Sequence, residues 1–228
     1  MRAKTIVAAG AILGFSTIAM GDVLYSTSFE NTDALGAKYF DTGDAEVAHD
    51  LVNNAGEAWV DVDGMDAAYA PFDPANVGLT DGDYVGVTTY APGGTYDGDQ
   101  HYQMSDTDGI MTLTSAVFDT ADFVTVALFI ANTGYEDADW VTVTMGGVEL
   151  YSIGGTDDGG LAMEEASGVW FLVSGAGDIG GALEISFASN SGSEALYIDS
   201  IFIEGAAIPG PAALALLGLA GFARRRRR

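Results

Sequence analysis

The sequence contains no cysteine and few basic residues, with eight Lys and Arg against 33 Asp and Glu among 228 residues. Without cysteine the chain cannot form disulfide bonds or thiolate zinc sites, and it has no cysteine nucleophile. A secreted domain of this size can do without disulfides when its core is large, so the absence does not argue against export.

Basic residues are missing from most of the chain. Arg2 and Lys4 lie at the start, five arginines end the chain, and Lys38 is the only basic residue between them. With one lysine against 33 acidic residues, residues 22–205 carry a formal charge of −32 at neutral pH. This charge repels nucleic acids and anionic membranes. It indicates adaptation to saline surroundings, binding of cations such as Ca²⁺, or both.

The first 21 residues have the order of a secretory signal peptide. A basic start precedes the apolar run 6–18, and Ala19 and Gly21 supply the small residues of a cleavage site. The mature chain is therefore predicted to begin at Asp22. The alternative is a retained N-terminal membrane anchor.

The middle of the chain, residues 22–205, has the pattern of β-strands. Apolar residues alternate with Thr, Ser or Glu in the runs 124–130, 141–145 and 183–187, and clusters of Gly, Asp and Asn separate such runs. About eleven short strands are expected, with one helical turn over Leu161–Ala166. The pattern predicts a single all-β domain, an antiparallel β-sandwich of jelly-roll type.

The chain ends in a motif of three parts. A Pro-Gly-Pro triplet precedes an apolar run, and the 18 residues from 206 to 223 reach about 27 Å as a helix, just enough for the hydrocarbon core of a bilayer. An arginine cluster follows and would stop translocation, leaving the domain outside. The tail residues are Pro209, Gly210, Pro211, Arg224, Arg225, Arg226, Arg227 and Arg228.

This tail resembles the PEP-CTERM sorting tail of bacterial envelope proteins. The resemblance implies recognition by an exosortase, a membrane processing enzyme, and delivery to the cell surface or an extracellular matrix. The family has Pro-Glu-Pro where this chain has Pro-Gly-Pro. A plain C-terminal anchor in the inner membrane is the alternative, and it also places the domain outside.

Two carboxylates are candidate ligands of a structural calcium. Glu30 closes the stretch SFE in the first expected strand, and Asp199 lies in YIDSIFIEG, the last one. The body resembles bacterial carbohydrate-binding jelly-roll modules, in which the first and last strands adjoin and often hold calcium. That resemblance implies Glu30 and Asp199 as ligands. The other acidic turns, including the turn with Glu136, Asp137 and Asp139, are expected to be solvated.

Aromatic side chains near expected loops are candidates for sugar binding, because flat rings stack on the apolar faces of pyranoses. Trp170 lies in an apolar stretch and is expected in the core. The candidates for a stacking platform are Tyr90, Tyr96, Tyr102 and Tyr135.

Catalysis finds little support in the sequence. His49 and His101 lack the spacing of a metal pair or a triad, and no nucleophile elbow, P-loop or dinucleotide motif is present. The chain is expected to be a non-enzymatic exported surface or matrix protein. The alternatives are an extracellular carbohydrate-binding module and, less favoured, a polysaccharide-active enzyme.

Overall fold

The computed structural model describes residues 21–30, 38–44, 46–72 and 83–206. Asp22–Ala206 form one compact unit, and its described residues include twelve strands and one short helix. The predicted processing segments lie outside the described residues, apart from Gly21 and Ala206, so the signal peptide, its cleavage site and the sorting tail stay predictions.

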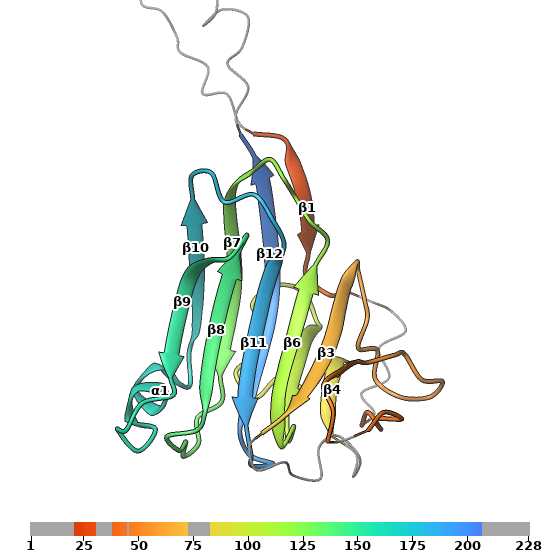
Figure 1. Ribbon diagram of the computed structural model, residues 1–228, viewed down its shortest axis with the longest axis vertical. Coiled ribbons are helices and arrows are strands. Elements are labelled where there is room, and N and C mark those ends of the chain that lie inside the picture. The colour runs from red at the N-terminus through yellow and green to blue at the C-terminus, as the bar shows by residue number, and fades with distance from the viewer. Residues whose placement is uncertain (1–20, 31–37, 45, 73–82, 207–228) are drawn as a thin grey trace, which may run out of the picture. The chain divides into compact units, whose positions relative to one another are not determined.

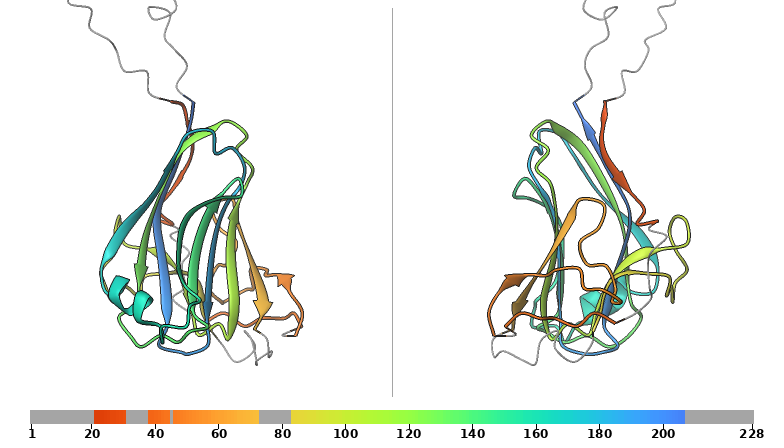
Figure 2. Two further views of the ribbon diagram at one scale, coloured as in Figure 1. Left: turned by 60° about the vertical axis from the view of Figure 1, so that its left-hand side comes forward. Right: turned by 90° about the vertical axis from the view of Figure 1, so that its right-hand side faces the viewer.

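Two six-stranded antiparallel sheets pack face to face as a β-sandwich of jelly-roll type, as the alternating pattern predicted (Figures 1 and 2). The first sheet has the order β10-β7-β12-β5-β4, with β1 also paired to β12. Its strands are β1 (Val23–Thr27), β4 (Tyr84–Thr88), β5 (His101–Ser105), β7 (Ala121–Ile130), β10 (Trp170–Ala176) and β12 (Ala195–Gly205).

The second sheet has the order β2-β3-β6-β11-β8-β9. Its strands are β2 (His49–Asp50), β3 (Met65–Pro71), β6 (Gly109–Ser115), β8 (Trp140–Met145), β9 (Val148–Gly154) and β11 (Leu183–Ser189). The helix α1 (Leu161–Ala166) has the predicted bounds. It is six residues long, and no helix in the described part of the chain has the length and hydropathy needed to cross a bilayer.

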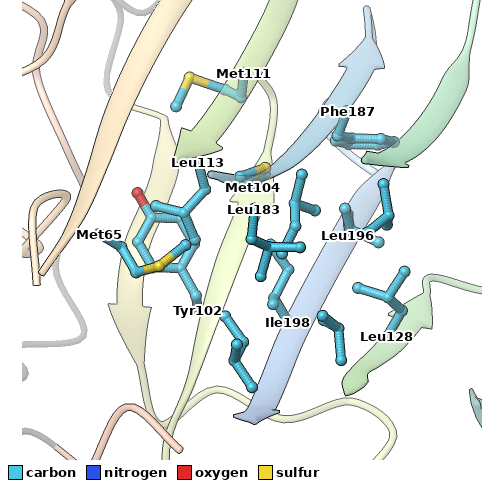
Figure 3. Packing of buried hydrophobic residues seen from close by; sticks show 14 of the residues in the cluster. Met65, Tyr102, Met104, Met111, Leu113, Leu128, Leu183, Phe187, Leu196 and Ile198 are labelled. Atoms are coloured by element: carbon cyan, nitrogen blue, oxygen red, sulfur yellow. The ribbon is translucent and has the colours of Figure 1, made fainter. Parts of the chain in front are cut away.

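The core lies between the sheets and follows from strand alternation. In β8, Val141, Val143 and Met145 are buried while the residues between them face outward. Side chains from both sheets meet in the interior, among them Leu113 of β6 and Leu128 of β7 (Figure 3). Full burial of each large apolar side chain stabilises the fold by about 1.5–3 kcal/mol.

The central strand β12 changes partner along its length. Residues 195–198 pair with β5, and residues 201–204 pair with β1 on the same edge. Between them lies a register shift in the pairing with β7, and Ser200 takes a positive φ of 46°. The first and last strands therefore do pair, as the resemblance to jelly-roll modules implied.

Candidate functional site

The outer face of the first sheet carries polar and aromatic side chains instead of core residues. In β5, Tyr102 and Met104 point into the core, so alternation places Gln103 and Ser105 on the opposite face. Tyr197 of β12 pairs with Gln103 and lies on the same outer face. These outward positions line a hollow on the surface.

The hollow is a groove with a volume of about 530 Å³. A second hollow of about 380 Å³ adjoins it and shares Tyr90, Ser193 and Tyr197 with it, so the two form one groove. The other residues lining the first hollow are Tyr84, Thr88, Gln103, Ser105, Gly192 and Ala195.

A cluster of aromatic rings supports one wall of the groove. Trp170 of β10 packs against Phe129 of β7 with ring centroids 5.6 Å apart, and its Nε1 donates a 2.9 Å hydrogen bond to the Gly94 carbonyl. A β-carbon at Gly93 would lie 2.2 Å from Phe129 Cε2, so the loop can approach this ring because residue 93 is glycine. The loop with Pro92 and Gly93 is thereby held at the groove.

His101 lies beneath this cluster and is fully buried. Its ring meets Tyr197 edge-on at 5.0 Å. Burial lowers the pKa of His101 to about 4, and the opposing contribution of the Tyr90 backbone does not offset it. Burial also raises the pKa of Tyr197. Both groups are neutral at pH 7, so neither the Tyr197 hydroxyl in the groove nor the His101 ring beneath it brings a charge there.

Of the four predicted stacking tyrosines, two are exposed. Tyr90 is 63% exposed and lines both hollows, and Tyr96 is 44% exposed beside Trp170.

The prediction is wrong for Tyr102 and Tyr135. Tyr102 is fully buried and its hydroxyl donates to the Val60 carbonyl at 2.9 Å. Tyr135 is 3% exposed and its hydroxyl donates to the Ala131 carbonyl. Both hydroxyls are satisfied inside the fold, which lets the rings serve as core.

Trp170 also departs from expectation, because it lies partly buried in the outer cluster and not in the main core. Gln103, Ser105 and Tyr197 also line the groove, although none of them is among the residues predicted from the sequence. The alternation of polar and apolar residues in His101–Ser105 was the available pattern, and it marks the odd-numbered positions as one face.

Glu30 and Asp199 both contact the same loop. Glu30 Oε1 accepts hydrogen bonds from the backbone N–H groups of Asp99 and Gln100, at 2.7 and 3.0 Å. Asp199 Oδ2 accepts from those of Tyr96 and Asp97, at 3.0 and 2.9 Å. The two carboxylates therefore anchor the 95–100 loop.

These contacts fit a calcium ion only in part. One oxygen of each carboxylate is already used by two N–H donors, and Asp199 Oδ1 accepts a further bond from Ser200 N–H at 2.6 Å. Donor groups around a carboxylate favour the anion itself and compete with a cation. Calcium ligation by Glu30 and Asp199 stays a prediction.

A different depression of about 250 Å³ lies on the second sheet, between β2, β3 and β6. Its lining combines three alanines and Ile110 with His49, Asp50, Tyr69 and Thr112, and His49 Nε2 lies 2.9 Å from Asp41 Oδ2. It offers fewer polar groups to a ligand than the groove on the first sheet does.

The chain matches no protein-family model and no curated protein sequence. Among solved structures, it is similar to the K3 cleaved adhesin domain of Lys-gingipain from Porphyromonas gingivalis W83. That likeness has 9% identity and a TM-score of 0.43, over 81% of this chain and 100% of that one.

Two other similar structures are carbohydrate-binding proteins by name. The CBM22-1 xylan-binding domain from Paenibacillus barcinonensis has 16% identity and a TM-score of 0.35, over 83% of this chain and 97% of that one. The carbohydrate-binding module CBM36, in complex with calcium and xylotriose, has 16% identity and a TM-score of 0.28, over 52% and 87%.

Proposed function

We propose that the Asp22–Gly205 sandwich is a non-catalytic module that binds a neutral polysaccharide outside the cell. The observation that carries this proposal is the groove on the first sheet, where the exposed ring of Tyr90 lies with Tyr197, Gln103 and Ser105. Rings supply stacking surfaces for pyranoses, and the amide and hydroxyl groups supply hydrogen bonds to sugar hydroxyls.

The dimensions and the supports of the groove favour this kind of ligand. The volume of its first hollow, about 530 Å³, lies within the usual range of small-ligand sites, about 300–1,000 Å³. The ring cluster behind it, with buried His101 and Phe129 and partly buried Trp170, holds the wall in place before a ligand arrives. Such preorganisation lowers the entropic cost of binding.

The charge of the chain favours a neutral polymer over an acidic one. Between Asp22 and Gly205 the formal charge is −32, and Lys38 is the only lysine or arginine there. A surface of one sign repels polymers of the same sign and slows their association. Uronic-acid polymers are therefore expected to bind more weakly than neutral ones.

The location forms part of the same proposal. The predicted signal peptide and the tail resembling PEP-CTERM would deliver the module to the cell surface or an extracellular matrix, where polysaccharides are present. An exosortase is the proposed partner in processing, and the run 206–223 is the proposed membrane anchor before processing.

The first test is retention of the full chain on a panel of immobilised polymers, with xylan, galactan, cellulose and a polyuronate as probes. Retention on a neutral polymer without release of reducing ends supports a binding module. Release of reducing ends would show an enzyme instead, and absence of retention on every neutral polymer would refute the proposal.

Variants locate the binding in the groove. Tyr90→Ala removes an exposed stacking ring, so we expect a Kd about tenfold higher, which corresponds to about 1.4 kcal/mol. Phe40→Ala is the matched control, because Phe40 is 46% exposed and does not line the groove. Equal losses in the two variants would place the ligand elsewhere.

A further inference from the structure

Three carboxylates meet at one end of the sandwich, away from Glu30 and Asp199. Glu136 and Asp139 lie in the turn before β8, and Glu194 directly precedes β12. One oxygen of each lies within 4.8 Å of the others. The sequence predicts solvated side chains in this turn. Asp139 is instead fully buried and Glu194 is 1% exposed, while Glu136 faces solvent.

The hydrogen bonds of this triad leave one buried oxygen unused. Asp139 Oδ2 accepts from the Glu136 backbone N–H at 2.6 Å, and Glu194 Oε2 accepts from the Asn190 backbone N–H at 3.1 Å. Asp139 Oδ1 is buried and has no hydrogen-bond partner among the described residues. A buried carboxylate oxygen without a donor is costly unless a cation faces it.

No basic side chain in the described part of the chain neutralises the triad. Lys38 is the only lysine or arginine there, and its Nζ lies over the Tyr84 ring, 4.7 Å from the centroid. Two buried carboxylates that no cationic side chain faces are unfavourable unless a positive charge enters the site.

We propose that Glu136, Asp139 and Glu194 form a binding site for a hard divalent cation, with Ca²⁺ as the ion that fits best. Calcium accepts irregular sets of six to eight oxygen ligands at about 2.3–2.6 Å, whereas Mg²⁺ requires near-ideal octahedral geometry and loses its waters reluctantly. Carboxylate oxygens that all lie within 4.8 Å of one another can share one cation. A set of ligands supplied by protein carboxylates therefore favours calcium. Exposed Glu136 gives the ion a route from solvent.

The position of the site suggests what the ion does. Glu194 lies between Ser193 and Ala195, which both line the groove, and the Ala131 N–H bonds the Ala195 carbonyl at 2.9 Å. An ion at Glu194 would join the turn before β8 to the start of β12 and so fix one edge of the groove. The ion site does not depend on the groove binding a polysaccharide, so each can fail alone.

The test compares melting temperatures of the full-length protein in chelator, in CaCl2, in MgCl2 and in NaCl of matched ionic strength. Calcium at about 100 times its Kd stabilises the protein that binds it by RT ln(1 + [L]/Kd). For a domain of this size, we therefore expect Tm in CaCl2 to be about 5 °C or more above Tm in NaCl. Magnesium is expected to raise it less. An equal rise in NaCl would mean that general screening of the acidic surface explains the effect, and would overturn the proposal.

Amide variants separate this site from the other candidate. Glu194→Gln and Asp139→Asn should lose the calcium shift, yet melt at or above the wild-type temperature in chelator because a neutral amide at these buried positions needs no cation. Glu30→Gln is the matched control and should keep the shift, since its amide oxygen still accepts from the 95–100 loop. Retention of the full shift in both triad variants, with its loss in Glu30→Gln, would overturn the proposal. A partial loss in all three would indicate two ions and support the triad.

Terbium luminescence tests the same site without altering the carboxylates. Terbium replaces calcium at oxygen sites and is excited through nearby aromatic rings, and Trp140 directly follows Asp139. Calcium should displace the luminescence of the wild-type protein, and Trp140→Phe should reduce it. Luminescence that calcium does not displace would count against the site even if the amide variants failed to fold.

Discussion

Replacing Trp170 tests whether the outer ring cluster holds the groove wall. Trp170→Phe keeps a ring against Phe129 but removes the 2.9 Å hydrogen bond to the Gly94 carbonyl, which is worth about 1 kcal/mol. Trp170→Ala also removes the ring contacts and is expected to lower the free energy of unfolding by about 3 kcal/mol. This is the low end of the range for replacing a core tryptophan by alanine, because Trp170 is partly exposed. At about 2–4 °C per kcal/mol, Tm should fall by about 3 °C in Trp170→Phe and by about 9 °C in Trp170→Ala.

The assay is thermal unfolding followed by polysaccharide retention on the same samples. Leu172→Ala is the control, because Leu172 lies on the same face of β10, is 52% exposed and makes no bond to the loop. Trp170→Ala should weaken retention although Trp170 does not line the groove, since the wall with Gly93 loses its support. If Trp170→Ala lowers Tm no more than Leu172→Ala does, the ring cluster does not support the wall and the reasoning is refuted.

Three further predictions concern buried polar groups. The pKa of His101 is about 4 in the folded protein, below its ordinary value, because the ring is buried. His101 therefore stabilises the fold above pH 6.5, and this stabilisation is lost as the pH falls from 6.5 to 4. In urea unfolding at several pH values, the free energy of unfolding of His101→Asn should lack this loss of about 3 kcal/mol. Burial raises the pKa of Asp199 to about 6, so Asp199 stabilises the fold at low pH and this stabilisation is lost as the pH rises through 6. From pH 4 to pH 8, the free energy of unfolding of the wild type should therefore fall by about 2 kcal/mol relative to that of Asp199→Asn. A difference between the two proteins that does not change with pH would contradict this prediction. Tyr102→Phe removes a buried bond to the Val60 carbonyl and should lower the free energy of unfolding by about 1 kcal/mol, measured by urea midpoint, with unchanged polysaccharide retention.

Local patterns were sufficient to predict the strands and the short helix. The alternation of Val141, Val143 and Met145 with threonines identifies a half-buried strand, because side chains in a strand point to opposite faces in turn. Leu161–Ala166 is helical as expected. These features depend on neighbours in sequence, and single-sequence reasoning captures such neighbours well.

The groove and the carboxylate triad could not be derived in this way, because both depend on strand pairing across long separations. Tyr197 meets Gln103 only because β12 pairs with β5. Asp139 and Glu194 meet only because the turn before β8 lies beside the start of β12. Tyrosine adds a further ambiguity, because its ring suits a core and its hydroxyl suits a surface. Tyr102 can be buried because its hydroxyl finds one internal acceptor, the Val60 carbonyl, and the sequence does not reveal that acceptor.

The central position of β12 has a mechanical consequence. A load applied through the residues after Gly205 would pull along the axis of β12, which is hydrogen-bonded to β7 on one edge and to β1 and β5 on the other. Ladder hydrogen bonds run perpendicular to the strands, so this pull shears many of them at once instead of opening them one by one. Withdrawal of β12 under force is then expected to be slow, which would suit the proposed polysaccharide-binding module if its C-terminal end served as the tether.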